Sequence, residues 1–88
     1  MPNIRQQEKR VRTAARERLE NLRYRSTVKT LTKRLQTAVE SGDADAVSTQ
    51  HRELVHWIDR AAARGALHRN TAARRKAQAA RLVAGQRG

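Results

Sequence analysis

The topology of the chain is set by residues 59–76, which read Asp-Arg-Ala-Ala-Ala-Arg-Gly-Ala-Leu-His-Arg-Asn-Thr-Ala-Ala-Arg-Arg-Lys. Gly65 follows a run of alanines and Arg64, and glycine can adopt the left-handed conformation that ends a helix at little steric cost. Five residues later, Asn70 can cap a new helix through its side-chain oxygen. The stretch therefore predicts one helix that ends near Arg64, a tight turn, and another helix that begins near Thr71.

The segment before this stretch predicts one long helix over residues 5–40, because it contains no Gly or Pro and is rich in Arg, Gln, Glu, Ala and Leu. Asn3 is placed to cap it. In the second half of this helix, apolar residues recur at the spacing of a buried face: Tyr24, Val28, Leu31, Leu35, Ala38 and Val39. The apolar residues of the first half are sparse and fall on the opposite side. We therefore expect residues 1 to about 20 to be frayed when free and ordered when bound.

The tripeptide Ser-Gly-Asp at residues 41–43 ends the first helix. Gly42 is the helix-ending residue and Asp43 the cap of the next helix. The second helix, over residues 44–64, has its own stripe at helical spacing: Val47, Gln50, Leu54, Trp57, Ile58 and Ala61. It should pack antiparallel on the first helix.

The third predicted helix, over residues 71–84, has four alanines within a narrow angular window: Ala73, Ala77, Ala80 and Ala84. Small side chains in a row let a helix approach its neighbours closely, so we assign this stripe to the packed face. Residues 85–88 read as a frayed tail. The sequence thus predicts a single all-α domain over residues 1–88: a three-helix bundle whose first helix is over-long and projects from it.

The composition limits both the core and the class of partner. With no Phe, one Trp and one Tyr among 88 residues, the core must come from Leu, Val, Ile and Ala. The net charge of +12 favours a polyanion as partner. The chain has no Cys, no apolar run after its basic N-terminus and no stretch of the roughly 20 apolar residues that cross a bilayer. We therefore expect a cytoplasmic protein.

The charge is distributed unevenly along the chain. Residues 1–34 contain eleven basic and three acidic residues, residues 35–63 two basic and five acidic, and residues 64–88 seven basic and none acidic. Most of the basic residues are Arg, whose planar fork suits phosphate oxygens. We expect phosphate contacts from two groups, Lys9, Arg10, Arg12, Arg16 and Arg18 on the projecting helix, and Arg69, Arg74, Arg75 and Lys76 after the turn. Asn70 and Thr71 can add the amides of a helix N-terminus.

Folded RNA fits this pattern better than other nucleic acids. Trp57 and Tyr24 lie on or near the apolar stripes, which leaves too few exposed aromatic side chains for a single-strand binder. No zinc-finger spacing, basic zipper or sheet-based RNA module is present. A nucleoid-type basic DNA-binding protein is the alternative, and a preference for duplex DNA would distinguish it. A helix-exchanging interaction protein and a membrane-surface helix are disfavoured, because the projecting half has neither heptads nor a broad apolar face.

The chain lacks the residue patterns of an enzyme or a metal site. His51 and His56 are five residues apart, about 140° around a helix, so they do not chelate as an i, i+4 pair does. His68 has no carboxylate near it in sequence to support a general base. We expect no catalytic residues, no metal and no cofactor.

Allowing Arg for Lys and Leu for Ile, residues 59–76 resemble the most recognisable segment of the bacterial small-subunit ribosomal protein S-twenty family. Met-Pro-Asn-Ile-Arg at residues 1–5, Lys-Arg-x-Arg-Thr at 9–13 and Ser-Gly-Asp at 41–43 also look like that family. The resemblance implies a three-helix, non-enzymatic protein of the small (30S) ribosomal subunit. It implies direct binding to the 5′ domain and penultimate helix of 16S rRNA, alongside other subunit components, in a way that holds separate rRNA segments together.

The resemblance also implies a set of rRNA contacts, carried over position by position: Lys9, Arg10, Arg12, Thr13, Arg18, His68, Arg69, Asn70, Arg74, Arg75 and Lys76. Four positions depart from the family pattern. Glu20 replaces a usual basic residue, Tyr24 a small or basic one, and Ala77 a common serine, while Trp57 is atypical. Each change affects its own contact rather than the fold.

Overall fold

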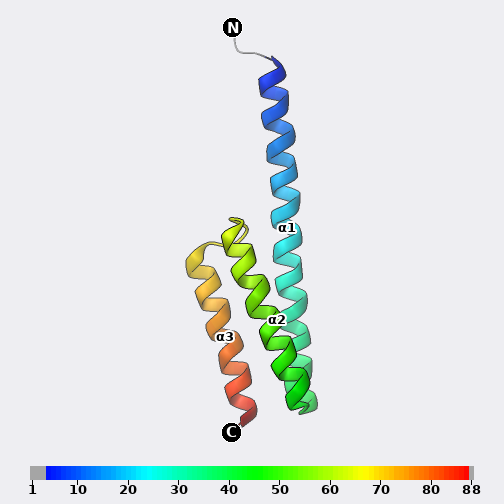
Figure 1. The fold of residues 1–88 in the computed structure, drawn as a ribbon, viewed down its shortest axis with the longest axis vertical. Helices are drawn as coiled ribbons and strands as arrows, with labels where there is room; N and C mark the ends of the chain where they lie inside the picture. Colours follow the sequence, from blue (N-terminus) through cyan, green and yellow to red (C-terminus); the bar gives the residue numbers. More distant parts are fainter. Residues whose placement is uncertain (1–3, 88) are drawn as a thin grey trace.

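The computed structural model describes residues 4–87 and the side chains of residues 7–85. It consists of three helices, α1 from Ile4 to Ser41, α2 from Ala44 to Ala63 and α3 from Arg69 to Arg87. Helix α2 runs antiparallel to α1 and α3 packs against both, while the N-terminal half of α1 extends beyond the other two helices (Figure 1). The predicted all-α bundle with a long projecting first helix is therefore confirmed. The predicted cap Asn3 lies outside the described residues.

The projecting part of α1 has no neighbour within the described chain. The helix has 38 residues, or about 57 Å at ~1.5 Å per residue, whereas α2 has only 20. Every side chain from residue 7 to residue 20 is exposed. The larger apolar residues here stay in solvent, with Val11 68% and Leu19 50% exposed. This half of α1 therefore gains no stability from the bundle core.

The core lies between the second half of α1 and the other two helices. The predicted stripes of α1 and α2 are confirmed, and Leu35, Leu54 and Ile58 are the largest fully buried side chains. The other buried apolar residues are Val28, Leu31, Ala38, Val47, Ala61, Ala66, Ala72 and Ala79. Because so many of these are alanines, each buries little apolar area, and the core is thin. In the described residues, no helix is both long and apolar enough to cross a membrane.

Local hydrogen bonds close the turn between α1 and α2, as the sequence predicts. Gly42 has a left-handed φ of 75°, and its N–H lies 3.1 Å from the carbonyl oxygen of Ala38. The carboxylate of Asp43 accepts hydrogen bonds from the backbone N–H groups of Asp45 and Ala46, at 3.1 and 3.2 Å. Backbone groups that would lack a partner at the end of α1 and the start of α2 therefore find hydrogen-bond partners within a few residues.

The end of α2 is a Schellman motif built around Gly65. This glycine has φ of 78°, and its N–H donates to the carbonyl of Ala62 at 3.1 Å. The N–H of Ala66 donates to the carbonyl of Ala61 at 2.8 Å, and both alanines are buried. These two bonds and the apolar contact define the motif. The predicted stop signal is thus confirmed.

The predicted start of α3 is wrong by two residues, because His68 and not Asn70 provides the cap. The backbone N–H of Asn70 donates to Nδ1 of His68 at 3.1 Å, and the helix begins at Arg69. An imidazole nitrogen here performs the role that we assigned to an amide oxygen. The helix also continues through Gly85 to Arg87, where we expected a frayed tail.

The predicted packed face of α3 is also wrong. The four stripe alanines are all exposed: Ala73, Ala77, Ala80 and Ala84. The buried residues are instead Ala72 and Ala79, with Leu82 and Val83 packed partly against the core. A rotation of about 100°, one residue step, separates the two faces. The observed rotation buries Leu and Val, which remove more apolar area from water than alanine does.

Candidate nucleic-acid interface

Exposed cations of α1 form one basic face along the projecting half of the helix. At about 100° per residue, Lys9, Arg12, Arg16 and Arg23 fall within a sector of roughly 60°, and all four are exposed. We call these four residues the α1 basic face. Thr13 lies at its edge, where its hydroxyl donates to the carbonyl of Lys9 at 2.9 Å. Three of the predicted contacts are therefore brought onto one surface.

The other two predicted cations of this helix lie elsewhere on its circumference. Arg10 and Arg18 are each more than about 120° from the centre of the α1 basic face. Both are exposed. One RNA strand that runs along the helix cannot contact them together with the basic face, so contact with all five requires RNA on more than one side of α1.

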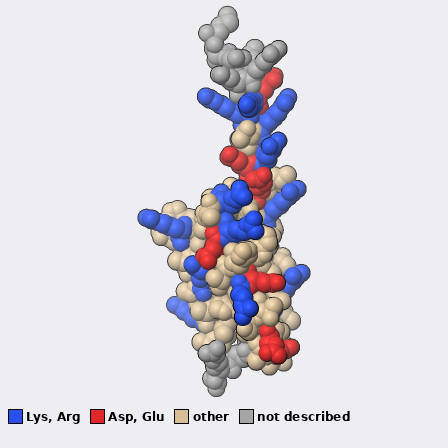
Figure 2. Space-filling model, in the orientation of Figure 1, with Lys and Arg blue, Asp and Glu red and all other residues tan. Residues whose placement is uncertain are grey.

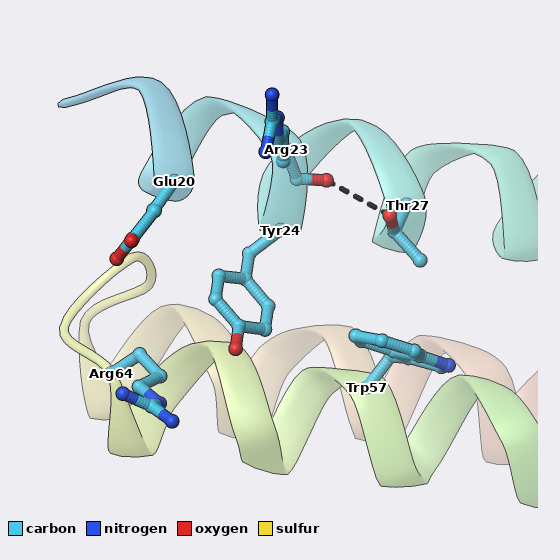
Figure 3. A pocket seen from close by; sticks show the side chains of 6 residues that line it. All are labelled: Glu20, Arg23, Tyr24, Thr27, Trp57 and Arg64. Atoms are coloured by element: carbon cyan, nitrogen blue, oxygen red, sulfur yellow. Dashed lines mark hydrogen bonds between the residues drawn. The ribbon is translucent and has the colours of Figure 1, made fainter. Parts of the chain in front are cut away.

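Arg23 is a residue of this surface that the sequence interpretation missed. It lies seven residues after Arg16, and this spacing was the signal that could have found it, since two helical turns return to the same face. Arg23 also lines a hollow where α1 leaves the bundle, together with Arg64 at the end of α2 (Figure 3). The basic first helix and the basic segment after residue 64 therefore meet at this point.

The cations after the turn are in two different states. Arg69, Arg74 and Arg75 are exposed. By contrast, Nζ of Lys76 lies 2.8 Å from Oδ1 of Asp59 on α2, so this ammonium already has an anionic partner. The exposed Arg74 and Arg75 lie about 100° apart around α3 and so face different directions.

The start of α3 offers less to an anion than the sequence predicts. The N–H of Asn70, which we expected to be free for phosphate, is bonded to His68. Thr71 is partly buried. Attraction of an anion at this end of the bundle therefore rests on the positive side chains near the turn rather than on the backbone amide of Asn70.

The whole surface combines many exposed cations with few carboxylates. Figure 2 shows Lys and Arg side chains along the projecting helix and over the visible face of the bundle, with Asp and Glu interspersed. In the described part of the chain, no three His, Asp or Glu side chains gather as metal ligands. What this arrangement can do is bind an extended anion by charge and by guanidinium hydrogen bonds.

Comparison with known proteins gives a consistent result. The family model described as Ribosomal protein S20 matches residues 2–84. The chain is 43% identical over 84 residues to the small ribosomal subunit protein bS20 of Kocuria rhizophila, in an alignment covering 96% of this chain and 98% of that protein. It is 44% identical over 88 residues to bS20 of a Picosynechococcus species, covering 92% and 89%. For bS20 of Corynebacterium jeikeium the identity is 42% over 76 residues, covering 86% and 87%.

Proposed function

Because the chain belongs to the ribosomal protein S20 family, a family of small-subunit structural proteins, we propose that it binds 16S rRNA directly and holds separate rRNA segments together during assembly. The binding is through the phosphate backbone. The family match confirms the family resemblance of the sequence, the ribosomal location and the structural, non-enzymatic role. The contacts with rRNA are the part that we infer.

The observation that carries this proposal is the projecting half of α1. Its described side chains are all exposed, it is rich in arginine, and no other part of the described chain packs on it. An isolated polar helix is marginal in water. Phosphates along the α1 basic face would neutralise its charge and stabilise it as a helix. Such contacts give position and affinity with little base specificity.

A second RNA segment is supported by the position of α3. Arg74 and Arg75 are exposed on α3, which packs within the bundle, whereas most of the α1 basic face lies on the half of α1 that projects from it (Figure 1). RNA along the projecting half of α1 and RNA along α3 would therefore touch different parts of the protein. By the family resemblance, the two segments are the 5′ domain and the penultimate helix of 16S rRNA.

The proposed contact residues keep the full predicted set: Lys9, Arg10, Arg12, Thr13, Arg16, Arg18, His68, Arg69, Asn70, Arg74, Arg75 and Lys76. Within it, Lys9, Arg12 and Arg16 rank highest on α1, because they share one face. Arg69, Arg74 and Arg75 rank highest on α3, because all three are exposed. Thr13 and His68 rank lower, since each already makes a hydrogen bond within the protein.

The test is competition binding at near-physiological salt. Labelled 16S 5′-domain transcript is bound to the full chain and challenged with excess duplex DNA or unrelated structured RNA. Retained binding to the transcript supports the proposal. Displacement by duplex DNA would overturn it in favour of the nucleoid-type DNA-binding alternative. Equal displacement by any structured RNA would show that the chain has no specific rRNA site.

Matched charge variants sharpen this test. Arg74→Gln with Arg75→Gln removes two proposed contacts, whereas Lys29→Gln with Lys33→Gln removes two exposed cations outside the proposed set. The first pair should lower the salt dependence of transcript binding by about two phosphate equivalents, and the second should leave it unchanged. Equal effects of the two pairs would mean that only net charge matters.

A further inference from the structure

The hollow where α1 leaves the bundle has features that phosphate contacts do not use. It measures about 350 Å³ and is lined by Glu20, Arg23, Tyr24, Thr27, Trp57 and Arg64. We call it the junction hollow. Four of its residues come from α1, while Trp57 belongs to α2 and Arg64 immediately follows it (Figure 3). It is thus formed only when the two helices pack together.

We propose that the junction hollow binds one unstacked nucleotide of the bound RNA, with the base against Trp57 and Tyr24 and selected by Glu20. This inference rests on the proposed function and deepens it, because it adds base recognition at one position to backbone contacts. Sequence-specific RNA recognition commonly uses splayed bases that stack on aromatic side chains and hydrogen-bond along their edges.

The aromatic part of the hollow is held in place by neighbours. The ring centroids of Tyr24 and Trp57 are 6.0 Å apart with an interplanar angle of 49°. The guanidinium carbon of Arg60 lies 5.6 Å from the Trp57 centroid, and the ring of His56 meets it edge-on at 5.9 Å. Tyr24 and Trp57 are only partly buried. A base would therefore meet an ordered aromatic surface that retains access to solvent.

The charges of the hollow suit the other parts of a nucleotide. Arg23, in the middle of α1, and Arg64, just after α2, both line it and can bind the flanking phosphates. The Arg23 side chain points away from α2, toward the outer side of α1 (Figure 3). Arg23 is also a member of the α1 basic face, so an RNA strand on that face would reach the hollow directly. A base turned out of that strand would enter the hollow.

Glu20 gives the hollow a means of choosing the base. Among the described residues, the carboxylate of Glu20 forms no ion pair with Arg23 or Arg64; the ion pair present is between Lys76 and Asp59. An ionised carboxylate only accepts hydrogen bonds. Guanine presents two adjacent N–H donors on its Watson–Crick edge, whereas uracil presents one. The junction hollow should therefore prefer guanine.

The first experiment uses Trp57 as the probe, because it is the only tryptophan in the chain. Emission of the full chain is measured during titration with the 5′-domain transcript, while affinity is measured separately with labelled transcript. Stacking should quench Trp57 strongly at saturation. Titration with guanosine and uridine monophosphates should quench more with the former. Unchanged emission at saturating transcript, or equal quenching by the two nucleotides, would overturn the inference.

The second experiment uses the sign of a charge effect. Next to a polyanion, removing a negative charge that only repels phosphate tightens binding. Glu17→Gln, at an exposed position one turn away, should therefore tighten transcript binding or leave it unchanged. Glu20→Gln should instead weaken it several-fold, because it loses a charged acceptor for the base. Tighter binding by both variants would overturn the inference.

A third variant tests stacking without emptying the core. Trp57→Leu keeps an apolar side chain against α1 and should lower transcript affinity about tenfold, within the range known for base stacking. Helicity by circular dichroism shows whether the variant folds. Wild-type affinity in a folded Trp57→Leu protein would overturn the inference while leaving the proposed function intact. Absence of transcript binding by the wild-type chain would instead defeat the proposed function itself.

Discussion

Nζ of Lys76 lies 2.8 Å from Oδ1 of Asp59, so a cation expected at the RNA surface connects α3 to α2. The side chains are 41% and 56% exposed and 17 residues apart in sequence. The pair lies beside the face of α3 that carries Ala72 and Ala79 into the core. It is therefore compatible with the observed rotation of α3.

This ion pair should contribute little to stability and less to RNA binding than its neighbours. Because both side chains are largely in solvent, a double-mutant cycle with Asp59→Asn and Lys76→Met should give a coupling of about 0.2 to 1 kcal/mol, smaller at high salt. Lys76→Met should lower transcript affinity less than Arg74→Gln does. An equal loss would show that Lys76 exchanges Asp59 for phosphate on binding.

Gly65→Ala should destabilise the protein by about 1 to 2 kcal/mol in chemical denaturation, because an L-residue is strained at φ of 78°. No atom of the described residues lies within 4 Å of the added Cβ, so strain and not collision is the cause. Gly85→Ala is the matched control. It lies within α3, also has open space, and should be neutral or stabilising by up to about 1 kcal/mol. Similar effects of the two substitutions would contradict the assigned cause.

Gln50→Met should leave the free energy of unfolding unchanged or raise it by up to about 1 kcal/mol. Oε1 of Gln50 is buried and has no hydrogen-bond partner among the described residues, and an apolar side chain of similar length removes that desolvation cost. Gln78→Met at an exposed position should change stability by less than about 0.5 kcal/mol. Destabilisation by Gln50→Met well beyond the control would mean that the amide is usefully bonded in solution.

Amide hydrogen exchange should divide α1 into two parts. In the free protein, amides of residues 7–20 should exchange rapidly, whereas those near Leu31 and Leu35 should be protected by the core. Adding the 5′-domain transcript should protect the first group. Strong protection of residues 7–20 in the free chain would show that this helix is stable without RNA.

The features that the sequence predicted correctly depend on local chemistry. Gly42, Asp43 and Gly65 act through backbone conformation and hydrogen bonds to residues at most five positions away. The error at the start of α3 arose because residue preferences favour Asn as a cap, whereas here Nδ1 of His68 is closer to the helix start. Which of two nearby acceptors is used depends on the path of the turn.

The junction hollow was not visible in the sequence. Glu20, Tyr24 and Trp57 were noted separately as departures from a family pattern, and only the packing of α1 on α2 places them around one space. Tyr24 and Trp57 are 33 residues apart, and Arg64 follows the end of α2. Periodicity shows which residues share a face of one helix but not what they meet on another.

The sequence by itself determined the number of helices, their order, the core faces of α1 and α2 and a polyanion as partner, because these follow from local turn chemistry, apolar periodicity and charge. Only the tertiary structure decided which face of α3 is buried: Ala72 lies in the core, whereas Ala73 is exposed. In an alanine-rich helix the alternative faces differ by few apolar atoms. The packing of Leu82 and Val83 against the core therefore decides how α3 is rotated about its axis. That rotation also places Lys76 beside Asp59.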